Sequence, residues 1–157
     1  MAGPLKTLTQ KHKIKGKIVV VAAQWHEDII EALCQSACAA LLHAGIKKSN
    51  IITVKTPGSF ELPLAALCAA RQKNVAGVVC LGCLIEGETP HFHYIAQAVA
   101  QGLMDVSLST QKPVGFGVLT ARDKKQAQDR AGGKWGNKGE EAAAAVLEMA
   151  RLGDVRF

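Results

Sequence analysis

Apolar and polar positions along this chain fall into blocks that predict strands and helices in turn. Residues 17–23 are rich in Val and Ile without polar alternation, which is typical of a strand covered on both faces. From about residue 27 to 43 apolar side chains recur at helical spacing, and Gly45 follows as a left-handed cap. The chain therefore opens with a buried strand followed by an amphipathic helix.

The same alternation continues to the C-terminal end. Further strands are predicted at 51–55, 77–85 and 114–119, and helices at 59–73, from Pro90 onward, at 123–130 and at 137–151. Ser59 is the expected N-cap of its helix, and Pro63 is tolerated in the first turn. This order predicts an α/β fold: a single-domain three-layer sandwich with a four-stranded parallel sheet between helices.

Composition agrees with one folded domain. The chain has 157 residues, of which 48% are hydrophobic and 20% are charged, enough for a substantial core and unlike a disordered chain. The apolar run 18–23 is too short for a bilayer or a signal peptide, so we expect a cytoplasmic protein with no membrane role.

Positive charge is concentrated in the N-terminal arm. Of the formal net charge of +6, five units come from Lys6, Lys11, Lys13, Lys15 and Lys17, before any acidic residue. We therefore divide the chain into a basic arm, 1–15, and a domain, 16–157. The arm lacks the interleaved aromatic residues of a nucleic-acid reader, so no nucleic-acid partner is expected.

Cysteine usage predicts neither disulfides nor a metal site. An odd number of cysteines, five, suggests reduced thiols. A C-x-x-C pair lies in a predicted buried strand without a second pair to complete a zinc site, and two histidines two positions apart do not share a helix face. The C-x-x-C pair is Cys80 and Cys83, and the two histidines are His91 and His93. Cys34, Cys38 and Cys68 are expected to pack in the core.

The segment Gly87-Glu88-Thr89-Pro90-His91 predicts an anion site beside an imidazole. Thr89 is a favoured N-cap and Pro90 suits the first helical position, so the free amides of the helix start there. Those amides favour a phosphate, and Gly87 lets the backbone approach it. His91 falls in the first turn, where the helix dipole favours the neutral imidazole that can accept a proton. Plain helix capping is the alternative interpretation.

Other predicted strand ends carry candidate ligand contacts, because ligands bind at the carboxyl ends of parallel strands. Trp25 offers a flat face for a heterocycle or fills the core. The amides of Ser59 and Phe60 could meet polar ring atoms, and Glu61 could accept hydrogen bonds from hydroxyls or favour a helix dipole. Three cations could pair with the phosphate or complement a helix end: Arg130, Lys134 and Lys138. Together these residues suggest a ligand with a flat ring, a hydroxylated chain and a phosphate.

Four motifs in order resemble those of the 6,7-dimethyl-8-ribityllumazine synthase family. They are PGSFELP at 57–63, LGCLIEGETPHF at 81–92, FGVLT at 116–120 and RAGGKWGNKGEEAA at 130–143, and the resemblance covers roughly residues 16–152. It implies a flavodoxin-like fold and the penultimate step of riboflavin synthesis. In that step 5-amino-6-(D-ribitylamino)uracil condenses with 3,4-dihydroxy-2-butanone 4-phosphate, with no cofactor and no metal.

The resemblance also implies a role for each candidate residue. Trp25 would stack on the pyrimidine, and His91 would transfer protons. Ser59, Phe60 and Glu61 would bind the ring and ribityl chain, and the backbone of Cys83, Leu84 and Ile85 would hold the pyrimidine. The phosphate would meet Gly87, Glu88 and Thr89. A neighbouring subunit would contribute Phe116, Lys138 and Arg130, of which Arg130 is the main catalytic cation for the phosphate.

Three positions depart from the commonest family pattern. Trp25 stands where Phe is usual, His26 where Asn is frequent and Glu86 where Arg often appears. Stacking survives the first change, whereas Glu86 adds a negative charge near the expected phosphate loop.

Assembly is implied by the same resemblance. Family members form pentamers, some of which build a capsule of sixty chains, and riboflavin synthase is a further partner that the family allows. The short join 132–136 favours the capsule, and the N-terminal arm would add a strand to a neighbour's sheet. Two alternatives to the enzyme are a non-catalytic flavin- or lumazine-binding protein and a purely structural shell protein.

Overall fold

The strands of the main sheet are parallel and are ordered β2-β1-β3-β4. A computed structural model describes residues 14–152, so most of the predicted arm, 1–15, lies outside the described residues. The strands are β1 (Lys17–Ala23), β2 (Ile51–Thr56), β3 (Val75–Ile85) and β4 (Val114–Ala121). The predicted four-stranded parallel sheet is confirmed, with each strand within two residues of its expected ends.

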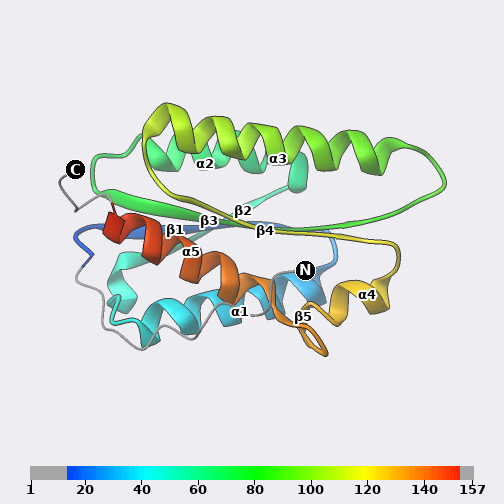
Figure 1. Cartoon of the computed structure of the whole chain (residues 1–157), viewed down its shortest axis with the longest axis horizontal. Helices are drawn as coiled ribbons and strands as arrows, with labels where there is room; N and C mark the ends of the chain where they lie inside the picture. The colour runs from blue at the N-terminus through cyan, green and yellow to red at the C-terminus, as the bar shows by residue number, and fades with distance from the viewer. Residues whose placement is uncertain (1–13, 153–157) are drawn as a thin grey trace.

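Helices cover both faces of this sheet. Figure 1 shows α2 (Leu62–Ala70) and α3 (His91–Thr110) on one face, and α1 (Glu27–His43), α4 (Lys124–Gln128) and α5 (Lys138–Leu152) on the other. The three-layer sandwich predicted from the sequence is therefore confirmed.

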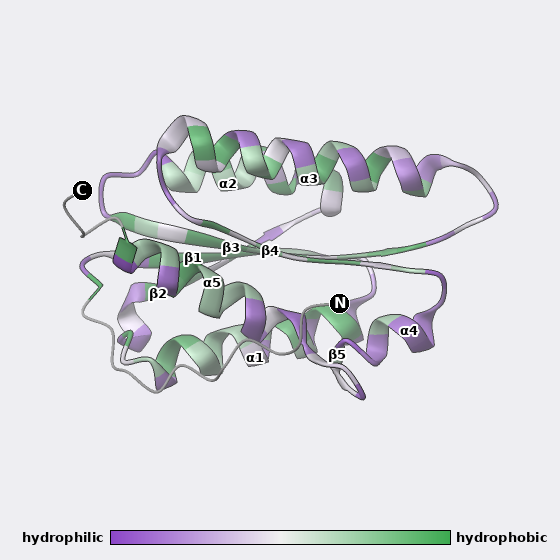
Figure 2. Ribbon diagram, viewed as in Figure 1, coloured by the Kyte–Doolittle hydropathy of each residue, from purple (hydrophilic) through white to green (hydrophobic). Residues whose placement is uncertain are grey.

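Alternating side chains of β1 supply both halves of the core. Ile18, Val20 and Ala22 pack in the cluster beneath α1 and α5, whereas Val19 and Val21 pack beneath α2 and α3. β1 lies between β2 and β3, so its residues are buried on both faces, which explains its unbroken apolar sequence. In Figure 2 the ribbon of β3 has mostly the hydrophobic colour, whereas hydrophobic and hydrophilic residues alternate along α3.

The predicted helix at 59–73 begins and ends differently. Residues Ser59–Glu61 form a 3₁₀ turn (η2) before α2, and the N-cap is Gly58 rather than Ser59. The Glu61 carboxylate closes this turn by accepting a 2.9 Å hydrogen bond from the Gly58 N–H. The helix ends at Ala70 because β3 already pairs with β1 at Val75, so the residues between them must turn.

The join between the last two helices contains a small antiparallel ribbon that the sequence analysis missed. It consists of β5 (Ala131–Gly133) and β6 (Gly136–Asn137). The helix before it, α4, is shorter than predicted at both ends, whereas α5 keeps its predicted length and begins one residue later. Gly132 and Gly136 have φ angles of 113° and 77°, which glycine adopts without steric cost. Strands this short give no periodic pattern to detect.

One cysteine expectation was wrong. Cys68 lies on the exposed side of α2, whereas Cys34 and Cys38 are half-buried against the core, and Cys80 and Cys83 are buried in β3. All five cysteines are free thiols.

Among residues 14–152, no helix is long and apolar enough to cross a membrane.

Close packing of α1 against α5 depends on Gly139. A methyl group at this buried position would overlap the carbonyl oxygen of Leu33, a backbone atom that cannot move aside. We expect Gly139→Ala to lower the free energy of unfolding by about 2 kcal/mol, measured by urea denaturation at fixed protein concentration. Gly87→Ala is the control because its added methyl group would meet no atom within 4 Å. Equal free energies of unfolding for the two variants would mean that the packing of α1 against α5 does not depend on Gly139.

Candidate active site

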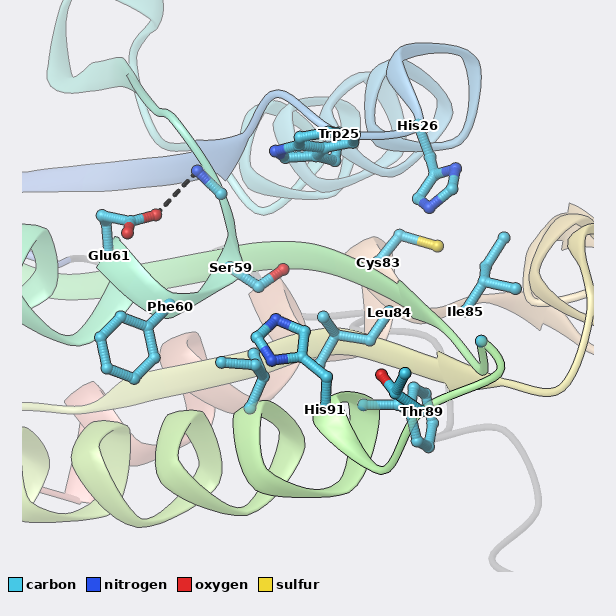
Figure 3. A pocket seen from close by; sticks show the side chains of 14 residues that line it. Trp25, His26, Ser59, Phe60, Glu61, Cys83, Leu84, Ile85, Thr89 and His91 are labelled. Atoms are coloured by element: carbon cyan, nitrogen blue, oxygen red, sulfur yellow. Dashed lines mark hydrogen bonds between the residues drawn. The ribbon is translucent and has the colours of Figure 1, made fainter.

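A cavity of about 430 Å³ lies at the carboxyl ends of β1, β2 and β3, beside the start of α3. Figure 3 shows the side chains that line it. They come from three segments that are distant in sequence, and the lining residues are Trp25, His26, Gly58, Ser59, Phe60, Glu61, Cys83, Leu84, Ile85, Gly87, Thr89, His91, Phe92 and Ile95. This is the position at which ligands bind in open parallel sheets.

Trp25 is a surface of the cavity and not part of the core. Its side chain is 70% exposed, so the core interpretation was wrong. Gly58 passes close to the indole, since a Cβ atom there would lie 3.5 Å from Trp25 Cδ1. Figure 3 shows the indole edge-on, with one face toward the side where Ser59 and His91 lie. This face can stack on a flat heterocycle.

The turn after β2 supplies polar groups to the same cavity. Glu61 uses one carboxylate oxygen to close the turn at Gly58, yet its side chain still lines the cavity. A role at the start of the helix and a role in accepting hydrogen bonds from a ligand are therefore compatible. Ser59 is buried, and within residues 14–152 its hydroxyl has no hydrogen-bond partner. Gly82 makes room for this hydroxyl, because a Cβ atom there would lie 2.7 Å from Ser59 Oγ. A buried hydroxyl without a partner favours a polar ligand.

The end of β3 presents backbone groups rather than a reactive thiol. Pairing between β1 and β3 stops at Ala22 and Leu81, whereas β3 continues to Ile85 along β4. On the side toward β1, residues 82–85 therefore have backbone edges without a strand partner. Burial, with a smaller contribution from Asp28, raises the pKa of the Cys83 thiol to about 12, so this thiol is neutral near pH 7 and a poor nucleophile.

The loop before α3 brings His91 to the cavity. Figure 3 shows the imidazole directed into the cavity from the first residue of α3. The N-cap is Pro90 without any side-chain cap, so the cap predicted at Thr89 is not formed. Gly87 and Thr89 line the cavity, but the exposed Glu88 does not. The helix N-terminus thus lies beside an imidazole, as the sequence predicted.

Sequence similarity to known proteins points to one family. The family model of 6,7-dimethyl-8-ribityllumazine synthase matches residues 15–154. The chain belongs to this family. It is 53% identical over 130 residues to the synthase of Cytophaga hutchinsonii, covering 83% of this chain and 82% of the relative. It is 43% identical over 148 residues to that of Thermus thermophilus, covering 94% of each, and 43% identical over 133 residues to that of Aquifex aeolicus, covering 85% and 86%.

Three residues expected in the lumazine synthase site lie outside the cavity of their own chain. Phe116 is 48% exposed on the edge strand β4. Arg130 follows α4, where its Nη1 donates a 2.9 Å hydrogen bond to the Gln126 carbonyl, a contact that matches the helix-end interpretation. Lys138 pairs with Glu141 at the start of α5. Within one chain these residues do not complete the site.

Four lining residues were missed as ligand contacts: His26, Gly58, Phe92 and Ile95. Phe92 and Ile95 are apolar residues in the first turns of α3, and Gly58 has no side chain to suggest a role. Glu86, the departure from the lumazine synthase pattern, instead faces a second cavity and lies 3.7 Å from His93 Nε2. His93 therefore points away from the cavity that His91 lines, as helical spacing predicted.

Proposed function

We propose that this chain is a 6,7-dimethyl-8-ribityllumazine synthase. It condenses 5-amino-6-(D-ribitylamino)uracil with 3,4-dihydroxy-2-butanone 4-phosphate and releases phosphate and water. Family membership supports this reaction, and the observation that carries it to this chain is one cavity with three kinds of contact. These are the exposed indole of Trp25, the polar turn at Ser59 and Glu61, and the helix N-terminus at His91.

Each part of the two substrates has a matching surface. The pyrimidine stacks on Trp25, with its polar edge on the free backbone of residues 82–85. The ribityl hydroxyls meet Glu61 and the Ser59 hydroxyl. The phosphate lies at Gly87 and Thr89, where α3 begins and its N-terminal amides favour an anion.

The chemistry needs proton transfer and positioning. The ring amine attacks the carbonyl of the phosphorylated ketone and forms an imine with loss of water. Loss of a proton from the hydroxyl-bearing carbon then expels phosphate from the neighbouring carbon, and the enol that results tautomerises to a ketone. The second amine closes the ring onto this new carbonyl with loss of a second water. His91 removes and returns the protons of these steps, and holding both substrates in one cavity supplies much of the acceleration. The neutral Cys83 thiol takes no part.

We further propose that the working site lies between two subunits of a pentamer. Phe116, Arg130 and Lys138 are all at least partly exposed and lie outside their own cavity, so they can reach the cavity of a neighbour.

The five free thiols favour a reducing compartment, the cytoplasm. Riboflavin synthase is the macromolecular partner that we propose, because it consumes the lumazine.

The short β5–β6 join favours assembly of these pentamers into a capsule of sixty chains. With a subunit mass of 16.6 kDa, such a capsule has a mass of about 1 MDa. We expect light scattering coupled to size exclusion to give this value across several buffers. A constant mass near five subunits would exclude the capsule and leave the pentamer in place.

The reaction itself is tested by mixing purified protein with both substrates and recording lumazine absorbance and fluorescence. We expect saturable turnover above the uncatalysed condensation. Tight binding of a ribityl ligand without turnover would instead support the non-catalytic binding protein. The absence of both turnover and ribityl-ligand binding would support a structural shell protein.

A further inference from the structure

His26 has a backbone conformation that side chains rarely adopt. Its φ and ψ angles are 62° and 57°, in the left-handed region, where among residues 14–152 only Gln111 joins it as a non-glycine residue with positive φ. The residue turns the chain from β1 into α1, and its carbonyl oxygen accepts hydrogen bonds from the N–H groups of Ile29 and Ile30, each at 3.0 Å. The path of the chain therefore fixes this strained conformation.

The left-handed turn accepts histidine but does not require it. Glycine would adopt the same angles without steric cost, and asparagine tolerates them well. The His26 side chain does not cap α1. Within the described residues it has no hydrogen-bond or ion-pair partner, although it is half-buried. Non-glycine residues held in the left-handed region cluster at functional sites.

The imidazole of His26 lies where a heterocycle would have its polar edge. It lines the cavity next to Trp25, and Figure 3 shows it between the indole and the end of β3, near Cys83 and Ile85 and away from Glu61. This is the stretch in which β3 has run beyond its pairing with β1. A ring stacked on the indole would thus have His26 and the free β3 backbone along its edge.

We infer that His26 is a specificity-determining residue that hydrogen-bonds the polar edge of the pyrimidinedione ring stacked on Trp25. A neutral imidazole carries one donor and one acceptor, so it can pair with a ring carbonyl or a ring N–H group. His26 selects and orients this ring, whereas proton transfer belongs to His91. The inference rests on the proposed function, because that function supplies the pyrimidinedione.

The test compares steady-state kinetics of the wild type with His26→Gly and His26→Asn, two variants that retain the backbone conformation. In His26→Gly we expect the KM of the ribitylaminouracil to rise about tenfold, as for one lost hydrogen bond, with kcat changed by less than about twofold. The KM of the phosphorylated ketone should stay constant. His26→Asn keeps a donor and an acceptor and should lie between the wild type and His26→Gly.

Gln111→Gly is the matched control, because Gln111 has a φ angle of 53° at the far end of α3 from His91. It relieves the same kind of backbone strain away from the cavity, so its kinetic constants should equal those of the wild type. An unchanged ribitylaminouracil KM in His26→Gly would overturn the inference, as would a rise confined to the phosphorylated ketone.

Titration with the unreactive 5-nitro analogue of the uracil separates this inference from the proposed function. An inactive wild type contradicts the enzyme, but the loss of analogue affinity in His26→Gly still supports the His26 contact. An active wild type whose analogue affinity is the same in His26→Gly contradicts only the inference. A wild type that does not bind the analogue overturns both.

Discussion

Replacing His91 with alanine is expected to lower kcat by about 10²- to 10⁴-fold while the ribitylaminouracil still binds. Its imidazole is directed into the cavity and is the proton-transfer group that the proposed mechanism needs at imine formation and ring closure. The surfaces that hold the pyrimidine, Trp25 and the end of β3, do not depend on this side chain. The measurement is kcat from lumazine formation, together with the affinity for the 5-nitro analogue from quenching of tryptophan fluorescence.

His93→Ala is the control for this variant. His93 lies two residues further along α3, but it faces Glu86 at 3.7 Å and lines a different cavity. Removing it changes the same helix turn without removing the imidazole from the site, so we expect kcat within about threefold of the wild type. Equal losses in the two variants would mean that the helix start, and not the His91 imidazole, is what catalysis requires.

The sequence predicted the layers of this fold because its strands are apolar without alternation and its helices are periodic. β1 and α1 were predicted with the same ends that the structure shows. Errors in the fold concern short elements and helix ends. The turn at Ser59–Glu61 is 3₁₀ because the Glu61 carboxylate bonds back to Gly58, and the β5–β6 ribbon is too short to have a period.

The candidate site was predicted less completely, since side-chain direction is not visible in a sequence. Motifs placed Trp25, Glu61 and His91 at strand ends, and the structure brings all three to one cavity. Whether Trp25 is exposed or packs in the core depends on the direction of its side chain, and the structure shows it to be exposed. His26 carried one sequence signal, a departure from the frequent Asn, and its left-handed backbone explains why residues of that kind occur there.

Arg130→Ala is expected to raise the KM of the phosphorylated ketone by about tenfold to hundredfold, the loss of a charge-assisted contact to phosphate. Among the described residues the Arg130 side chain hydrogen-bonds only the Gln126 carbonyl, and it does not line the cavity of its own chain. The proposed role therefore requires that the guanidinium enter the cavity of the next subunit. This requirement can be tested directly by mixing variants.

Subunits of His91→Ala and Arg130→Ala, each nearly inactive at low ketone concentration, are unfolded together in equal amounts and reassembled. In a ring whose sites take His91 from one chain and Arg130 from the next, about one quarter of the sites would contain both native residues. Activity should therefore recover to about a quarter of the wild-type value. Mixing His91→Ala with Ser59→Ala is the control, because both residues line the same chain's cavity and every site keeps one defect. Failure of the first mixture to exceed the second would mean that Arg130 does not act across the interface.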